Sequence, residues 1–261
     1  MLYIVYTTED PVSEGIAEAL IHIAGFEDAG SAIGSRLLSS KALGARMLEL
    51  NASLLEAERL DNLGADALIL LSKHSSSKSI PSLTVHPTGN WSDKAELGGK
   101  PKELSMAAPL YMRAVLRALS IFNNDKAMIV TYEATHHGPL LMTPSMFVEI
   151  EEHSYTHKNA ETVAMAIVDA LQKVEKLQVA IGIGSIHYPQ KFTALALGGR
   201  YAFSHMMPKY YVDNVDMIEE AAARSDPKAD LAVIDWKSIS AAQRKQVIGE
   251  LEKIGLKYER I

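Results

Sequence analysis

Short apolar runs alternate with amphipathic stretches along the whole chain. A short apolar run is typical of a buried strand, and apolar positions three and four apart are typical of a helix. Strands are predicted at 2–6, 47–50, 67–71, 83–85, 127–130, 146–150, 179–183 and, last, 231–235. Helices are predicted at 12–24, 107–122, 159–174, 190–197 and, last, 239–254. This alternation predicts an α/β fold: one domain over residues 1–261, with a sheet of parallel or mixed strands and helices on both faces.

Histidines gather where four of the predicted strands end. Gly138-Pro139 breaks regular structure after one of these strands, and open α/β sheets usually bind ligands at strand ends. We therefore expect one cleft lined by His74, His86, Glu133, His136, His137, Glu149 and His187. The alternative is that each histidine is a separate surface or core residue.

The residue types in this group suit a metal site. Glu133 and His136 lie three apart, and imidazole with carboxylate suits zinc in particular. Bound zinc lowers the pKa of its water to about 7, and Glu133 or Glu149 would accept the proton as general base. Serine chemistry at residues 75–77 is the competing interpretation, but the chain lacks a Gly-x-Ser-x-Gly elbow. His153 and His157 precede or begin a helix, so we expect both to be exposed.

Composition narrows the class of protein. The 261 residues are 48% hydrophobic and 22% charged, which is ordinary for a soluble globular protein. The chain has no cysteine, which removes disulfides, thiolate zinc sites and cysteine nucleophiles, and fits a cytoplasmic protein. No apolar run approaches the roughly 18 residues of a membrane span, and the N-terminus lacks a signal-peptide pattern.

Charge is unevenly distributed. Residues 1–66 hold eleven acidic against four basic residues, whereas residues 72–102 hold five lysines against two acidic residues. An acidic flank beside a basic, histidine-rich middle is compatible with a phosphate-bearing substrate. Loops that are merely rich in lysine would give the same pattern.

Several longer stretches resemble those of the archaeal and plant D-aminoacyl-tRNA deacylases. They are Ser-Lys-His-Ser-Ser at 72–76, residues 81–90, Glu-Ala-Thr-His-His-Gly-Pro at 133–139 and Phe-Val-Glu-Ile at 147–150, followed by 182–184, 187–188, 192–193, His205 and 208–210. Their order and spacing match from residue 2 to about residue 250. Two departures stand out: Glu151-Glu152-His153 replaces the usual Gly-Ser, which weakens any role for the 151–157 loop, and Ser185-Ile186 replaces a glycine-containing pair before His187.

The resemblance implies hydrolysis of the ester between a D-amino acid and the terminal ribose of tRNA, with zinc as cofactor. It also implies a fold similar to phosphorylase/hydrolase-like α/β proteins, and tRNA as partner without DNA or membrane. The sequence does not determine the oligomeric state, for which we favour a monomer. We assign metal binding to Glu133, His136 and His187, catalysis to His74, His137 and Glu149, and substrate binding to Lys73, His86, Asn90 and Lys209. Phosphates of tRNA are expected to contact Lys73, Lys78, Lys94, Lys191 and Lys209.

Two other functions are compatible with the same residues. A metal-dependent hydrolase of a small amide or ester would use the same site. A non-catalytic metal- or RNA-binding protein would hold zinc without turning over any aminoacyl ester.

Overall fold

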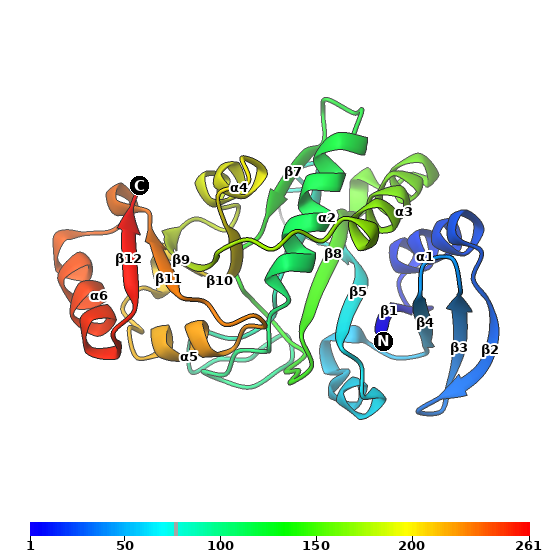
Figure 1. Cartoon of the computed structure of the whole chain (residues 1–261), viewed down its shortest axis with the longest axis horizontal. Coiled ribbons are helices and arrows are strands. Elements are labelled where there is room, and N and C mark those ends of the chain that lie inside the picture. Colours follow the sequence, from blue (N-terminus) through cyan, green and yellow to red (C-terminus); the bar gives the residue numbers. More distant parts are fainter. Residues whose placement is uncertain (76–77) are drawn as a thin grey trace.

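The computed structural model describes residues 1–75 and 78–261 (Figure 1), so the candidate nucleophiles Ser76 and Ser77 lie outside the described residues. The strands are β1 (Leu2–Thr7), β2 (Glu27–Ala32), β3 (Ser35–Ser40), β4 (Ala45–Leu50), β5 (Ala67–His74), β6 (Ser82–His86), β7 (Ile129–Tyr132), β8 (Ser145–Glu151), β9 (Val179–Ser185), β10 (Ala202–Pro208), β11 (Leu231–Ile234) and β12 (Lys257–Arg260). The α-helices are α1 (Pro11–Ala24), α2 (Pro109–Phe122), α3 (His157–Gln172), α4 (Gln190–Leu197), α5 (Met217–Ala223) and α6 (Ala241–Ile254).

Two sheets hold these strands. The larger has the order β2-β3-β4-β1-β5-β8-β6-β7, and the smaller has the order β10-β9-β11-β12. Strands β4, β1, β5 and β8 run parallel to one another, whereas β6 runs antiparallel to β8 and parallel to β7. All pairs of the smaller sheet are parallel. The fold is mixed α/β, as predicted, but its strands divide between two sheets where we expected one.

Helices cover the two sheets differently (Figure 1). Helices α1, α2 and α3 pack on one face of the larger sheet, in a core with strand residues such as Ile69, Val85 and Val148. The opposite face packs in part against the 3-10 segments Leu54–Glu56 and Glu58–Leu63. The smaller sheet has α2 and α4 on one face and α5 and α6 on the other. Part of the larger sheet is therefore left free of α-helices for polar side chains.

Local sequence explains where α1 begins and what it fixes. Asp10 caps the helix by accepting the N–H of Val12 at 2.9 Å, and Pro11 occupies the first turn. The second carboxylate oxygen of Asp10 accepts the N–H of Lys73 at 2.8 Å. One carboxylate therefore starts α1 and also anchors the end of β5 beside it.

The segment 133–135 joins the two sheets. The N–H of Glu133 donates to the carbonyl of Val85 in the larger sheet at 3.0 Å. The N–H of Thr135 donates to the carbonyl of Met206 in the smaller sheet at 3.1 Å, and the Thr135 hydroxyl accepts the N–H of Met206 at 3.0 Å. The chain that follows β7 thus lies in the seam between the sheets.

Apolar periodicity locates most elements to within three residues of their observed bounds, and the segment at 201–205 becomes β10. It misses β2, β3, α5 and β12, so the strand at 231–235 is not the last. Strands β2 and β12 form outer edges of the two sheets with mostly exposed side chains, so they carry no apolar alternation. Helix α5 has only seven residues, too few to show a clear helical period.

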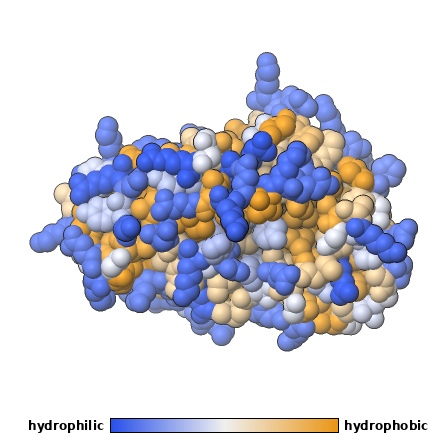
Figure 2. All heavy atoms as spheres, viewed as in Figure 1, coloured by the Kyte–Doolittle hydropathy of each residue, from blue (hydrophilic) through white to orange (hydrophobic). Residues whose placement is uncertain are grey.

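Hydrophilic side chains are spread over the face shown in Figure 2, with hydrophobic ones between them. Within the described ranges, no helix combines the length and the apolar character needed to cross a membrane. The most exposed large apolar or aromatic side chains are Leu97 and Tyr210, each 57% exposed.

Two glycines differ in the room they leave for a side chain. A Cβ at Gly138 would lie 2.3 Å from the backbone nitrogen of Gly99 and 2.7 Å from the carbonyl oxygen of Leu55. We expect Gly138→Ala to force these segments apart and to lower the free energy of unfolding by about 3 kcal/mol.

Gly249 in α6 has no atom within 4 Å of a Cβ. Gly249→Ala should therefore raise the free energy of unfolding by about 0.5–1 kcal/mol. Urea denaturation measures the free energy of unfolding of both variants. A Gly138→Ala variant as stable as the wild type would contradict the close packing around Gly138.

Candidate functional site

A cluster of five histidines and two glutamates lies on the face of the larger sheet opposite α1–α3. Glu149 of β8 pairs in register with Ser72 of β5 and with Thr84 of β6. Side chains two residues apart on a strand point to the same face. His74 and His86 therefore approach Glu149 from its two sides. Because β6 is antiparallel to β8, the cluster lies across the sheet, not at one common edge of strand ends.

The segments after β7 and β9 complete the cluster. Glu133 follows β7 directly, His136 and His137 come three and four residues later, and His187 lies two residues after β9. All seven residues expected in one cleft are thus brought together. Five of them line a cavity, whereas Glu133 and His86 are fully buried beneath it.

Glu133 lies at the centre of the cluster. Its Oε2 is 2.9 Å from Nε2 of His187 and 3.5 Å from Nε2 of His136, and its Oε1 is 3.2 Å from Nδ1 of His74. Neither oxygen has a partner in good hydrogen-bond geometry among the described residues. Burial alone would raise the pKa of the Glu133 carboxyl, but the surrounding histidines outweigh it and hold this pKa well below its ordinary value.

Glu149 connects two of the histidines. Its Oε2 lies 3.5 Å from Nδ1 of His74 and 3.4 Å from Nε2 of His86. Burial of His74 lowers its pKa, but the contacts with Glu133 and Glu149 outweigh burial and raise the pKa to about 10. His74 therefore carries a positive charge at neutral pH.

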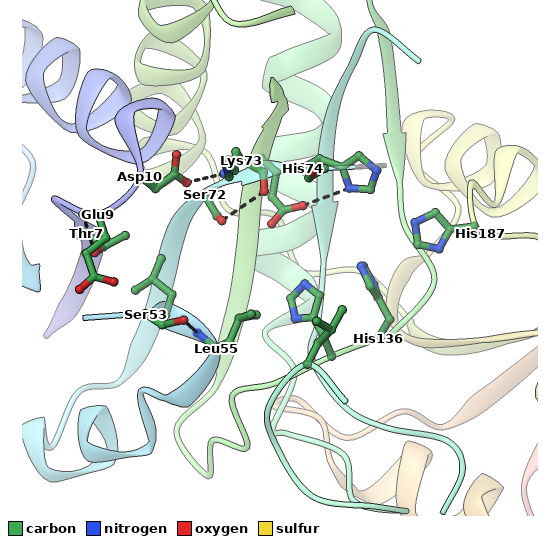
Figure 3. A pocket seen from close by; sticks show the side chains of 15 residues that line it. Thr7, Glu9, Asp10, Ser53, Leu55, Ser72, Lys73, His74, His136 and His187 are labelled. Atoms are coloured by element: carbon green, nitrogen blue, oxygen red, sulfur yellow. Dashed lines mark hydrogen bonds and ion pairs between the residues drawn. The ribbon is translucent and has the colours of Figure 1, made fainter. Parts of the chain in front are cut away.

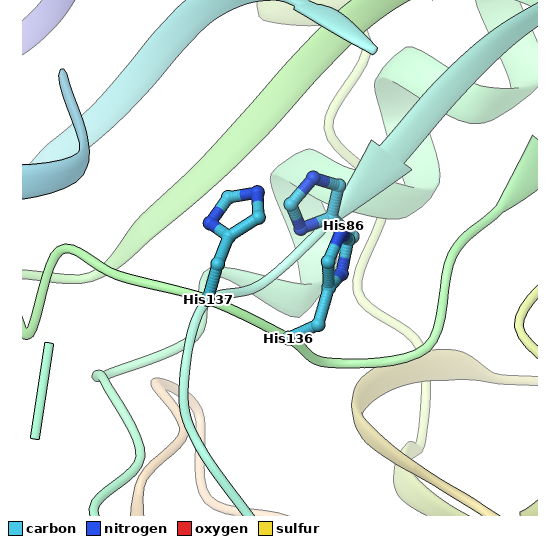
Figure 4. Close-up of side chains that lie close together, drawn as sticks. All are labelled: His86, His136 and His137. Carbon is cyan, nitrogen blue, oxygen red and sulfur yellow. The ribbon is translucent and has the colours of Figure 1, made fainter. Parts of the chain in front are cut away.

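His86, His136 and His137 lie close together (Figure 4), and one ring nitrogen of each lies within 4.8 Å of the others. In each ring, Nδ1 lies close to a backbone carbonyl oxygen. The distance is 3.1 Å from His86 to Pro87, 2.8 Å from His136 to Ala134 and 2.6 Å from His137 to Gly138. A carbonyl only accepts, so each ring donates from Nδ1, and a neutral ring keeps a free lone pair on Nε2. His86 differs from the other two, because burial is outweighed by its contacts with Glu149, which raise its pKa. Burial, followed by neighbouring histidine charges, lowers the pKa of His137 to about 4 and that of His136 well below its usual value.

These donors fit a metal ion. Three sets place their ligand atoms within 4.8 Å of one another: His86, His136 and His137; His74, Glu133 and His187; His86, Glu133 and Glu149. Metal-binding imidazoles typically donate their second nitrogen to a carbonyl or carboxylate, as these histidines do. The buried carboxylate of Glu133, without a hydrogen bond of its own, is a further donor. The predicted ligands divide between sets, with His136 in the first and Glu133 and His187 in the second.

A cavity of about 590 Å³ opens beside the cluster (Figure 3). This volume lies within the range of small-molecule sites, roughly 300–1,000 Å³. The cluster contributes His74, His136, His137, Glu149 and His187 to its wall. The rest of the wall is Thr7, Glu9, Asp10, Ser53, Leu54, Leu55, Ser72, Lys73, Ser75 and Leu97.

A second cavity of about 340 Å³ reaches the same histidines. His136, His137 and Leu97 line both cavities and so separate them. The other residues of the smaller cavity are Gly89, Asn90, Trp91, Ser92, Lys94, Glu96, Thr135 and Tyr211. The cluster is therefore accessible from two cavities.

Comparison with known proteins agrees with the motifs of the sequence. Residues 62–259 match the family model described as D-aminoacyl-tRNA deacylase. The chain belongs to the D-aminoacyl-tRNA deacylase family. It is 36% identical to the D-aminoacyl-tRNA deacylase of Pyrococcus furiosus, covering 99% of each chain, and 34% identical to that of Thermococcus onnurineus over the full length of both. Its fold is similar to the crystal structure of a conserved protein of unknown function, with a TM-score of 0.91 at 28% identity, covering 100% of this chain and 95% of that one.

In this D-aminoacyl-tRNA deacylase family member, the residues assigned to substrate lie in different surroundings. Lys73 lines the larger cavity with its Nζ 2.6 Å from Oε1 of Glu152, so the 151–157 loop does contact the site. Asn90 lines the smaller cavity. His86 is fully buried with Phe147 stacked on its ring at 5.4 Å. A substrate contact by His86 does not match this position, because its imidazole has no exposed surface.

The lysines expected to face tRNA also differ in whether a carboxylate lies close to them. Lys191 is 2.6 Å from Asp235, and Lys94 is 3.8 Å from Glu96. In the described part of the chain, neither Lys78 nor Lys209 has a carboxylate oxygen within 4.0 Å. His153 and His157 are both exposed, as predicted.

Tyr188 belongs to the site although the sequence reasoning gave it no role. Its hydroxyl lies 3.1 Å from Nε2 of His74. Since His74 is protonated on both nitrogens, Nε2 donates to this hydroxyl. The signal in the sequence was the position of Tyr188 next to His187 after a predicted strand end.

His205 is a structural histidine. Its Nε2 lies 2.9 Å from the carbonyl oxygens of Ser105 and of Arg224, and its Nδ1 lies 3.2 Å from the hydroxyl of Thr135. Nε2 therefore carries the proton, and Nδ1 accepts from Thr135. Burial outweighs the carbonyl contacts and lowers the pKa of His205 to about 4.

This shift predicts a pH dependence of stability. In the unfolded chain His205 takes up a proton below about pH 6.5, whereas in the folded chain it stays neutral down to about pH 4. Its contribution to the free energy of unfolding is therefore complete above pH 6.5 and falls by about 3 kcal/mol between pH 6.5 and 4. We expect the stability advantage of the wild type over His205→Gln to shrink by this amount in urea denaturation. A constant difference from pH 7 to pH 4 would contradict a neutral buried His205.

Proposed function

We propose that the chain hydrolyses the ester that joins a D-amino acid to the 3′-terminal ribose of tRNA, and so recycles mischarged tRNA. The observation that carries the proposal is the buried His/Glu cluster opening onto a cavity in a member of the D-aminoacyl-tRNA deacylase family. The cavity is large enough for an aminoacyl group. The carboxylate of Glu149 and the charged imidazole of His74 both lie in the wall of this cavity.

We further propose zinc as the metal. His86, His136 and His137 would hold it through Nε2, since each ring is oriented by a carbonyl at Nδ1. When bound, zinc supplies a Lewis acid and lowers the pKa of its water to about 7. Glu133 orients the cluster from beneath through its contacts with His136 and His187.

Glu149 and His74 act as base and acid in this proposal. As a water oxygen bonds to the ester carbonyl carbon, one of its protons passes to Glu149. His74 gives its Nε2 proton to the Tyr188 hydroxyl, 3.1 Å away, as that hydroxyl gives its own proton to the ribose oxygen and the ester C–O bond breaks. Free amino acid and tRNA with its hydroxyl restored then leave the site. Glu149 releases its proton to solvent, and His74 regains a proton at Nε2 through Tyr188.

Release of tyrosine from charged tRNA tests the function. We expect D-tyrosyl-tRNA to be hydrolysed about a hundredfold or more faster than L-tyrosyl-tRNA. A chelator should abolish the reaction and added zinc should restore it. Equal rates on both enantiomers would contradict the proposed substrate. Full activity in chelator with no metal in the protein would contradict the role of zinc.

The His136→Ala variant tests the proposed ligands. We expect it to lose both bound zinc and deacylation, because an incomplete ligand set binds metal poorly. His153→Ala is the matched control, since His153 is exposed and lies outside both cavities. Zinc retained with a rate lower by about 10²–10⁴ would make His136 an acid or base instead. Unchanged zinc and rate would remove His136 from the site.

A further inference from the structure

Tyr210 exposes an aromatic ring at the edge of the site. It lies in the 3-10 segment Lys209–Tyr211, directly after β10, and 57% of its surface is exposed. Its ring packs against that of Tyr211 with centroids 4.9 Å apart and planes at 66°. Tyr211 therefore supports the ring of Tyr210, and more than half of the Tyr210 surface stays exposed to solvent.

The tyrosine pair leads into the smaller cavity. Tyr211 lines this cavity together with Trp91, His136 and His137. The charge of Glu133 also acts on the Tyr210 phenol, whose pKa is raised first by its partial burial. A ligand lying on Tyr210 would therefore continue past Tyr211 into the smaller cavity and reach His136 and His137.

Charge distinguishes the two cavities. Lys209, next to Tyr210, has no carboxylate oxygen within 4.0 Å among the residues that the structure describes. Over residues 1–75 and 78–261, the smaller cavity is lined by one lysine and one carboxylate, Lys94 and Glu96, which lie 3.8 Å apart. The larger cavity is lined, over the same residues, by three carboxylates, those of Glu9, Asp10 and Glu149, and its one lysine, Lys73, is paired with Glu152. The charge of Lys209 favours a phosphate chain beside it, and the carboxylates of the larger cavity disfavour one. The same carboxylates favour the ammonium group of an amino acid in the larger cavity.

We propose that the unpaired 3′ end of tRNA stacks on Tyr210 and enters the smaller cavity, so that the aminoacyl group lies in the larger one. This assignment rests on the proposed deacylase function. Proteins that bind single strands combine cations for the backbone with aromatic rings on which bases stack. The smaller cavity, about 340 Å³, suits one terminal nucleoside. The ester between nucleoside and amino acid then lies at the partition formed by His136 and His137.

Binding of uncharged tRNA tests this assignment without requiring turnover. The Kd is measured for whole tRNA and for the same tRNA lacking its three 3′ nucleotides, with wild type, Tyr210→Ala, Tyr210→Leu and Tyr210→Phe. We expect the wild type to bind whole tRNA more tightly than the shortened one. Tyr210→Ala and Tyr210→Leu should weaken binding of whole tRNA about tenfold and leave the shortened tRNA unaffected, whereas Tyr210→Phe should match the wild type.

Salt dependence separates the neighbouring lysine from the ring. Lys209→Ala should reduce the slope of log K against log salt by about one, and Tyr210→Ala should leave the slope unchanged. A wild type that binds no zinc or does not deacylate tRNA would contradict the proposed function. The binding results for Tyr210 would not be affected by that outcome. Wild-type binding of both tRNAs by Tyr210→Ala overturns the inference. So does an effect of that variant on self-association of the chain alone, which would make Tyr210 a contact between copies.

Discussion

The burial of Glu133 among histidines is the interaction on which the rest of the site depends. An unpaired carboxylate in a protein interior is strongly unfavourable, so it is retained only where opposite charge or a metal surrounds it. His74 comes from β5, His136 from the segment after β7, and His187 from the segment after β9. The backbone of 133–135 bonds to both sheets. The cluster is therefore complete only where the two sheets meet.

Environment, not residue type, determines what each histidine does. His74 contacts two carboxylates and is charged. His136 and His137 lie against carbonyls and other imidazoles, and both are neutral, because burial and these neighbours outweigh the contact of His136 with Glu133. His205 is neutral too, but both of its nitrogens bond to protein atoms, which leaves it no free donor or acceptor. In the proposed function the same side chain serves as proton donor in His74 and as metal ligand in His136 and His137, whereas in His205 it joins loops through hydrogen bonds.

The sequence was sufficient to predict which residues meet but not on which surface they meet. Histidines at strand ends are visible in one dimension because apolar runs mark the strands. The direction of β6 is not, since a strand has the same apolar pattern when it runs either way, and this direction moves the cluster from the sheet edge to the sheet face. The burial of His86 follows from the same reversal, which places it opposite Phe147 of β8.

The larger cavity is encoded in two separate parts of the chain. The histidines and Glu149 in its wall come from residues within 62–259, the range that matches the family model, whereas Thr7, Glu9, Asp10 and residues 53–55 lie outside that range. Substitutions at Thr7, Glu9 or Ser53 would reshape the far wall, whereas Asp10 and Leu55 also contact the segments that carry His74 and His137. If the larger cavity receives the aminoacyl group, as we propose, the range of amino acids accepted depends on parts of the chain other than those that carry the cluster.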